Sequence, residues 1–198
     1  LQLHICLINC ITNAVLLCWI SMSLAAPLAC EDLMRPLDQL HPHRLVGRWA
    51  LVAGGLSHLP SLERFRQRDS ASIHFPSNSN ATSLSYTRSI CVGNKSLHTL
   101  FNITLEGSSF TYDGTDKSTV SSSFVHTSCR DCLLMHMDVQ SGKRIHFYLF
   151  SRRRQLEQEE MEEFKAQVQC LNMPPPVVMD PEKKLCLEEA DEDPEAPN

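Results

Sequence analysis

The tripeptide Gly47-Arg48-Trp49 lies in the first apolar run, residues 46–56, that follows an apolar N-terminal segment. A second signal stands late in the chain, where the basic cluster Arg152-Arg153-Arg154 follows the strand-like run 145–150. A tryptophan at the floor of a closed sheet can be covered by an arginine from the last strand, because a cation is attracted to the face of an indole ring. The two signals together predict that Gly47, Trp49 and Arg152 seal one end of a barrel.

Short runs of alternating apolar and polar residues fill the region between residues 46 and 151, and turn residues separate them. This pattern is typical of an all-β domain, and short connections such as Asp113-Gly114 have hairpin chemistry. Eight strands joined by hairpins can close into an antiparallel barrel that holds one small ligand. We therefore predict an eight-stranded up-and-down antiparallel β-barrel, with strands over residues 46–56, 69–76, 82–91, 95–106, 108–113, 119–129, 132–139 and 143–151.

Two stretches depart from the strand pattern. Residues 60–67 predict a short helical lid or loop with Ser61 as its N-cap. Residues 155–170 contain no Gly or Pro and predict a helix, because apolar residues recur there at helical spacing and form one stripe that can pack on the outside of the sheet. The stripe consists of Met161, Phe164, Val168 and Leu171.

The N-terminal and C-terminal ends differ from the rest of the chain. Residues 1–25 predict a signal peptide, with an apolar core followed by the small-x-small site Ser23-Leu24-Ala25. The chain starts at Leu1 without a basic segment, which indicates a truncated start, and an uncleaved signal anchor is the alternative. Residues 26–187 are expected to form one domain, and the acidic segment 188–198 is expected to be a disordered tail.

Cysteines and glycosylation sequons both predict secretion. Six cysteines follow the leader, and an even number in an exported domain implies up to three disulfides, with 15 alternative pairings. These six are Cys30, Cys91, Cys129, Cys132, Cys170 and Cys186. Three N-x-[ST] sequons begin at Asn80, Asn94 and Asn102. The net charge of −5 argues against a nucleic-acid partner, which would require a clustered basic face.

These residues resemble the lipocalins, and among them the group that includes α1-acid glycoprotein, apolipoprotein M and the saxitoxin- and tetrodotoxin-binding plasma proteins. The resemblance extends from Cys30 to Cys186. It rests on the segments Cys30-Glu31-Asp32-Leu33, Val46-Gly47-Arg48-Trp49, Tyr148-Leu149-Phe150-Ser151-Arg152, residues 163–171 and Lys184-Leu185-Cys186. The chain departs from the family pattern late in the barrel, where the Thr-Asp-Tyr type of turn is not recognisable.

The resemblance implies the disulfides Cys30–Cys170 and Cys91–Cys186. Cys129 and Cys132 remain, and their C-x-x-C spacing is found both in redox motifs and in structural disulfides. The absence of a βαβ pattern around them and the oxidising compartment favour a structural disulfide at a strand turn. We expect no metal site, because no second Cys/His pair stands at ligand spacing.

Alternation along two strands predicts which side chains face the barrel interior. Leu84, Tyr86, Arg88 and Ile90 share one face of run 82–91, and Ser83, Ser85, Thr87 and Ser89 share the other. In run 95–106 a glycan on Asn102 must point outward, which places Leu97, Thr99, Phe101, Ile103 and Leu105 inside. Apolar walls with a few convergent polar groups are typical of small-molecule sites.

Arg88 is the main candidate for ligand contact. A buried charge is costly unless it meets a partner or an anionic ligand group, although Arg88 could equally extend its guanidinium to the barrel mouth. Tyr86 and Tyr112 could line the pocket or fill it. The facing of the late strands stays open, because both faces are apolar there and His146 and Tyr148 alternate with Phe147 and Leu149. The full candidate ligand set is Arg88, Tyr86, Tyr112, Leu84, Phe101, Leu97, His126 and His136.

The leading functional hypothesis is a secreted carrier of a small lipophilic or amphipathic ligand, without cofactor or catalytic residues and as a monomer. The resemblance implies drugs, steroids, guanidinium toxins or lysophospholipids as ligand classes. Arg88 inside the barrel would favour an anionic ligand, whereas a carboxylate from Asp113, Asp116 or Asp138 would favour a cationic one. The alternatives are a glycan-mediated immune modulator and a lipocalin-type isomerase, which would need a free cysteine inside the barrel.

Overall fold

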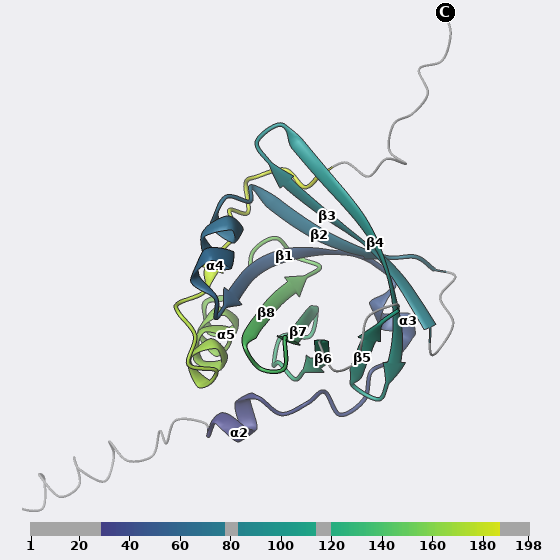
Figure 1. Ribbon diagram of the computed structural model, residues 1–198, viewed down its shortest axis with the longest axis vertical. Helices are drawn as coiled ribbons and strands as arrows, with labels where there is room; N and C mark the ends of the chain where they lie inside the picture. Colours follow the sequence, from purple (N-terminus) through teal and green to yellow (C-terminus); the bar gives the residue numbers. More distant parts are fainter. Residues whose placement is uncertain (1–28, 78–82, 114–119, 187–198) are drawn as a thin grey trace, which may run out of the picture. The chain divides into compact units, whose positions relative to one another are not determined.

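The computed structural model describes residues 29–77, 83–113 and 120–186. Its strands pair in sequence order from β2 to β8, and β1 pairs with both β8 and β2. Eight strands therefore close into an up-and-down antiparallel barrel, which confirms the predicted fold (Figure 1). The strands are β1 (Gly47–Leu56), β2 (Ser70–Phe75), β3 (Ser83–Val92), β4 (Lys95–Glu106), β5 (Ser109–Tyr112), β6 (Val120–Val125), β7 (Cys132–Val139) and β8 (Arg144–Ser151).

The first strand has two successive neighbours on one edge. It pairs with β2 as far as Ala50, and a short strand absent from the sequence prediction, β9 (Val177–Val178), pairs with it at Ala53 and Gly54. β6 ends at Val125, four residues before the predicted end, and an isolated bridge joins Val125 to Pro36. The segment before the barrel thus hydrogen-bonds to the backbone of residues 124–126, part of which the alternating pattern had assigned to further strand pairing.

Short helices precede the barrel in sequence, and two longer ones lie on its surface. They are α2 (Cys30–Leu33), α3 (Pro42–Leu45), α4 (Leu59–Arg66) and α5 (Gln158–Cys170). The predicted cap of α4 is wrong: His58 is the N-cap, and Ser61 lies inside the helix with its hydroxyl 2.9 Å from His58 Nδ1. Within the three described ranges, no helix is long and apolar enough to cross a membrane.

The last helix packs against the outside of the barrel, as the apolar stripe predicts. α5 begins behind a capping box formed by Glu157 and Glu160, and its residue Phe164 stacks on Phe147 of β8 with ring centroids 5.4 Å apart. Because Phe147 faces α5, the neighbouring side chains of β8 face the interior. The inward set of β8 is therefore His146, Tyr148 and Phe150, where the sequence left the facing open.

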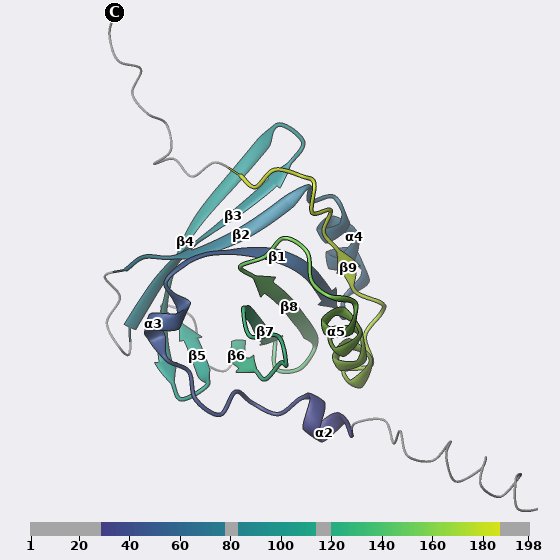
Figure 2. The same ribbon diagram turned by 180° about the vertical axis from the view of Figure 1, so that it is seen from behind.

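One end of the barrel is closed by the residues of the Gly-x-Trp stretch. Arg152 lies over Trp49 with 3.7 Å between the guanidinium carbon and the ring centroid, and it donates hydrogen bonds to backbone carbonyls of residues 44–46 and 48. Gly47 has a φ of +97°, and a Cβ there would lie 2.9 Å from the Arg152 guanidinium. Both conditions require glycine. Figure 2 shows this end of the barrel, with α3 beside the start of β1.

Two disulfides have both of their partners defined. Cys91 at the end of β3 is bonded to Cys186, which is the pairing that the resemblance implies. Cys129 is bonded to Cys132 across the turn that leads into β7. Cys30 and Cys170 are also disulfide-bonded, and their mutual pairing stays a prediction. The predicted leader and the whole acidic tail lie outside the described residues.

Candidate ligand-binding site

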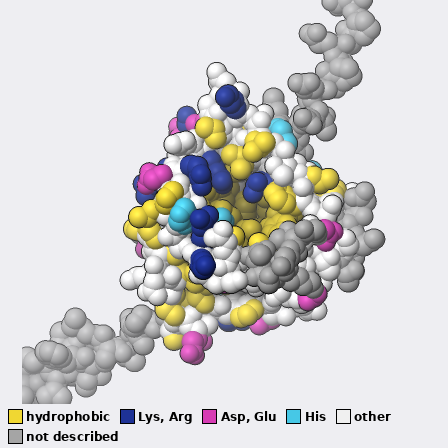
Figure 3. All heavy atoms as spheres, viewed as in Figure 1, with side chains coloured by type: hydrophobic (Ala, Val, Ile, Leu, Met, Phe, Trp, Pro, Cys, Tyr) yellow, Lys and Arg dark blue, Asp and Glu magenta, His cyan; other side chains and the backbone are white. Residues whose placement is uncertain are grey.

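The barrel interior holds a cavity that opens at the end opposite Trp49. The cavity measures about 60 Å³, and its walls come from β1, β2, β3, β5, β7 and β8. Figure 3 views the molecule from this side and shows a hollow walled by hydrophobic side chains and bordered by Lys and Arg side chains. The twelve lining residues are Leu51, Arg68, Ala71, Ile73, Tyr86, Arg88, Tyr112, Met135, Met137, His146, Tyr148 and Phe150.

A wider hollow adjoins the interior cavity at the mouth. It measures about 500 Å³, within the range of small-molecule sites, and lies between β4, the end of β5 and the start of β6. Arg88, Tyr112, Met137 and His146 line both spaces, so the hollow and the cavity lie side by side. A ligand could place one end in the hollow and reach inward if the flexible methionines moved aside.

Two arginines bring positive charge to this site. Arg88 lies with its guanidinium carbon 4.7 Å from the centre of the Phe101 ring, and its Nε is buried without a hydrogen-bond partner in the described structure. Arg68, just before β2, stacks on Phe65 and hydrogen-bonds to Tyr148. Burial lowers the pKa of Arg68, and Arg88 adds to this effect because the two cations repel each other. No Asp or Glu lines the interior cavity among the described residues.

The three tyrosines of the chain supply neutral polar groups to the same cavity. Burial is the main cause that raises the pKa of Tyr86, Tyr112 and Tyr148 above its usual value, so all three hydroxyls stay protonated. Tyr86 and Tyr112 share a hydrogen bond of 2.9 Å, and Tyr112 donates to Met137 Sδ at 3.8 Å. The cavity therefore holds neutral hydroxyl groups beside its cations.

A histidine completes the polar set. His146 Nε2 is buried and has no hydrogen-bond partner in the described ranges. Burial lowers the pKa of His146, and the nearby cations Arg68 and Arg144 lower it further. The cavity thus contains two unsatisfied buried nitrogen atoms, on His146 and on Arg88. An unsatisfied buried polar atom calls for an explanation, and a ligand that accepts hydrogen bonds supplies one.

Helix α4 covers one side of the mouth. It packs against β1 at Gly54, where the strand has no side chain. Phe65 of α4 is fully buried and stacks on Tyr148 with 5.8 Å between ring centroids. The same ring lies on Gly54 so closely that an added Cβ would be 2.4 Å from it. The predicted lid is therefore a helix that is fixed to β1 by a phenylalanine.

The structure places three of the eight predicted ligand residues at the interior cavity and one in the hollow. Arg88, Tyr86 and Tyr112 line the cavity, and Phe101 lines the hollow. Leu84 is buried in the inner core, paired with Ile103, and does not reach the cavity. Leu97 pairs with Ile90 on the predicted face but is 58% exposed.

The two predicted histidines do not lie at the cavity. His136 faces outward from β7, beside Phe147 and with 6.0 Å between ring centroids, because its neighbours Met135 and Met137 take the inward positions. His126 follows β6 at the closed end, where Gln167 of α5 donates to its carbonyl. The prediction that these two histidines line the cavity is therefore wrong: His136 lies on the outward face of β7, and His126 lies at the opposite end of the barrel.

Sequence reasoning missed the second arginine and the methionines. Arg68 lies between α4 and β2, where no alternating pattern indicates facing, whereas Met135 and Met137 follow from β7 once one residue of that strand is placed. The candidate carboxylates do not enter the interior: Asp113 lies at the rim and accepts a hydrogen bond from Thr104, and Asp138 accepts one from Gly142 in the hairpin. Asp116 lies outside the described residues.

Two of the three predicted glycosylation sequons lie at exposed positions of the described structure. Asn94 lies in the exposed turn between β3 and β4, and Asn102 is exposed on β4, while Asn80 lies outside the described residues. Exposure makes Asn94 and Asn102 accessible to a glycosylating enzyme, and their occupancy stays a prediction.

Comparisons with known proteins agree with this architecture. The sequence matches the ApoM domain family over residues 36–189. A solved structure described as the siderocalin Ex-FABP, which functions through dual ligand specificities, aligns with a TM-score of 0.60 and 12% identity, covering 74% of this chain and 96% of that one. At this identity the likeness shows the fold alone. A search of curated proteins finds no match.

Proposed function

Because the chain belongs to the ApoM domain family of lipocalins, we propose that it is a secreted carrier of a small lipophilic molecule with an anionic head group. The observation that carries this proposal is the pair of arginines at the cavity. Arg68 and Arg88 enter an interior cavity that no Asp or Glu lines among the described residues, whereas Asp113 lines the adjoining hollow, and Arg88 keeps a buried nitrogen without a partner. A phosphate or carboxylate would supply the missing acceptor.

The dimensions of the site support an amphipathic ligand. An anionic head would bind beside Arg68, Arg88 and the tyrosine hydroxyls, since charge-assisted hydrogen bonds are the strong ones. The apolar part would occupy the 500 Å³ hollow and extend inward on displacement of Met135 and Met137, whose side chains adapt readily. Lysophospholipids fit this description better than the basic drugs, steroids or guanidinium toxins that the resemblance also implies.

Other functions lack this support. A lipocalin-type isomerase would use a free cysteine inside the barrel, whereas every described cysteine is disulfide-bonded. A glycan-mediated immune modulator would need no charged cavity, so it gives no account of the buried Nε of Arg88. Secretion itself is supported by the disulfides, by the accessible sequons and by the predicted leader.

Calorimetric titration with two matched lipids tests the proposal. We expect lysophosphatidic acid to bind at least about tenfold more tightly than the monoacylglycerol of the same chain, because only the phosphate meets the arginines. Arg88→Gln and Arg68→Gln should each remove most of that difference. Arg154→Gln is the matched control, since Arg154 lines neither the cavity nor the hollow and donates hydrogen bonds to the carbonyls of Asp180 and Lys183. Equal binding of both lipids, or tighter binding of sphingosine, would contradict an anionic ligand.

A further inference from the structure

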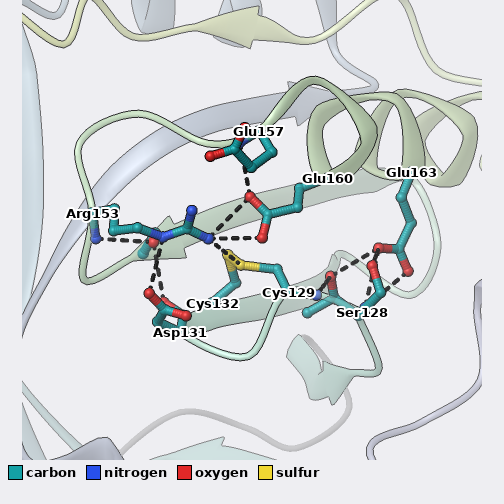
Figure 4. A network of polar contacts seen from close by, with 10 residues as sticks. Ser128, Cys129, Asp131, Cys132, Arg153, Glu157, Glu160 and Glu163 are labelled. Atoms are coloured by element: carbon teal, nitrogen blue, oxygen red, sulfur yellow. Dashed lines mark hydrogen bonds and ion pairs between the residues drawn. A yellow bond between two sulfur atoms is a disulfide. The ribbon is translucent and has the colours of Figure 1, made fainter.

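The C-x-x-C disulfide lies far from the ligand site and has no part in the proposed function. Cys129 and Cys132 are bonded at the closed end of the barrel, in the turn between β6 and β7. Their surroundings are polar and highly connected, as Figure 4 shows: Arg153 approaches the disulfide from the end of β8, and Glu160 and Glu163 approach from α5. These contacts surround a disulfide between cysteines only three positions apart in the sequence, and they could influence its reactivity.

The two sulfur atoms differ in their surroundings. Cys129 is only 4% exposed, and its Sγ accepts a hydrogen bond of 3.4 Å from Arg153 Nη2. Cys132 is half-buried and is the more accessible partner. A hydrogen bond from a guanidinium stabilises a thiolate, and a stabilised thiolate is the better leaving group in thiol–disulfide exchange. The geometry therefore distinguishes Cys132 as the sulfur to be attacked and Cys129 as the sulfur to be expelled.

Arg153 is held in place independently of the disulfide. It forms ion pairs with Glu160 at 2.7 Å and with Asp131 at 2.9 Å. These two carboxylates balance the charge of the guanidinium, so what Arg153 offers Cys129 is a directed hydrogen bond. The turn is also anchored to α5, because Ser128 and Thr127 donate hydrogen bonds to Glu163. Opening the disulfide would leave Arg153 beside Cys129.

A pocket gives access to the disulfide from solvent. It measures about 360 Å³, lies between residues 37–45 and the β6–β7 turn, and both cysteines line it. The exposed Arg44 and Arg130 and the histidines His41 and His126 also line it, and no Asp or Glu does so among the described residues. The positive charges favour a small thiol that carries negative charge.

We infer that Cys129–Cys132 is an exchange site for small anionic thiols. The thiol loses its proton to solvent, and its thiolate attacks Cys132 Sγ. The new sulfur–sulfur bond forms as the Cys129–Cys132 bond breaks, and Cys129 leaves as a thiolate beside Arg153. A second thiolate can then attack the sulfur of the first small molecule in this mixed disulfide and expel Cys132 as a thiolate. Two small thiols are thereby oxidised to their disulfide, and the protein disulfide is reduced to two cysteines.

Reaction of the full protein with glutathione under native conditions tests this inference. After an acid quench and alkylation, cleavage before Asp131 separates the two cysteines for mass spectrometry. We expect Cys129–Cys132 to open before Cys91–Cys186, with the glutathione adduct on Cys132 and the alkylated thiol on Cys129. An adduct on Cys129, or earlier opening of Cys91–Cys186, would overturn the inference, and neither measurement depends on a variant that folds.

Two variants test the roles of the arginines. Arg153→Gln should slow opening by about threefold, because a leaving thiol of higher pKa departs more slowly, whereas Arg154→Gln should leave the rate unchanged. Arg130→Gln should slow the reaction with glutathione more than the reaction with 2-mercaptoethanol, whose thiolate carries one negative charge fewer. Equal rates for Arg153→Gln and Arg154→Gln would refute the role of Arg153 in expelling Cys129. An unchanged glutathione rate in Arg130→Gln would refute entry through the basic pocket.

Discussion

At the residue scale, the sealed end of the barrel depends on the shape of one guanidinium group. Arg152 donates to several carbonyls at once while its plane covers Trp49, whose own Nε1 donates to the Leu45 carbonyl at 2.7 Å. A lysine would carry the same charge but could neither span these acceptors nor stack flat on the indole ring. The planar guanidinium group of Arg152 therefore contributes more to sealing this end of the barrel than its positive charge does.

Replacement of Arg152 by lysine should lower the free energy of unfolding by about 1–3 kcal/mol, because several carbonyls of the segment before β1 lose their donor. Urea denaturation measures the change. Arg154→Lys, in the same basic cluster, should change stability by less than about 0.5 kcal/mol. Similar losses in both variants would show that the cluster acts through its charge.

His146 is expected to make stability depend on pH. Burial holds its pKa below the usual 6.5, so the unfolded chain takes up a proton first as the pH falls. Its contribution to stability is complete above about pH 6.5 and is lost as the pH falls toward the lowered pKa of the folded state. The pKa of His136 is lowered in the same direction, again mainly by burial.

His146→Gln should therefore reduce the loss of unfolding free energy between pH 7.5 and pH 5, and combination with His136→Gln should reduce it further. Urea titrations at the two pH values measure this. An unchanged difference between the two pH values in the double variant would mean that other groups cause the acid destabilisation.

At the scale of elements, α4 and β1 meet where β1 has no side chain. Phe65 occupies the inner face over Gly54, and the next residue, Gly55, lies on the outer face, where an added Cβ would be 3.1 Å from Val168 of α5. β1 is thus in close contact with a helix on each side at successive positions. Two adjacent glycines let one strand receive the lid helix within the barrel mouth and the C-terminal helix outside.

Gly54→Ala should destabilise the protein by about 1–3 kcal/mol, since the new methyl group and the Phe65 ring cannot both be accommodated without a shift of α4. Phe65→Leu in the same chain should recover part of this loss, although it costs stability by itself. A double-mutant cycle by urea unfolding measures the coupling. Strictly additive effects would exclude direct contact as the cause.

At the scale of the whole molecule, the disulfides constrain very different lengths of chain. Cys91 and Cys186 are separated by 95 residues, whereas Cys129 and Cys132 are separated by three. A crosslink stabilises mainly by restricting the unfolded chain, and the restriction grows with the length of the closed loop. Cys91–Cys186 therefore contributes more to stability than Cys129–Cys132, which can open at a smaller cost to the fold.

Paired replacement by serine measures this difference. Loss of Cys91–Cys186 should lower the free energy of unfolding by about 4 kcal/mol, and loss of Cys129–Cys132 by about 2 kcal/mol or less. Thermal or urea unfolding of the two double variants provides the values. A larger loss at the short disulfide would show that local packing outweighs chain entropy.

The sequence predicts strands and their order better than it predicts the site. β4 and β7 have the predicted bounds, because alternation and turn residues are local properties. The facing of β8 depended on α5, which covers Phe147 and makes both faces of that strand apolar. Arg68 depended on the path of the chain after α4. Side chains from separate elements make the cavity, and no local pattern records how those elements meet.

The barrel also separates its chromophores by position. All three tyrosines of the chain line the cavity, whereas Trp49, the only tryptophan beyond the predicted leader, lies under Arg152 at the sealed end. Ultraviolet difference absorbance of tyrosine should therefore report a ligand that enters the mouth. Emission of Trp49 should report whether the floor is intact, so the molecule carries two built-in optical probes for its two ends.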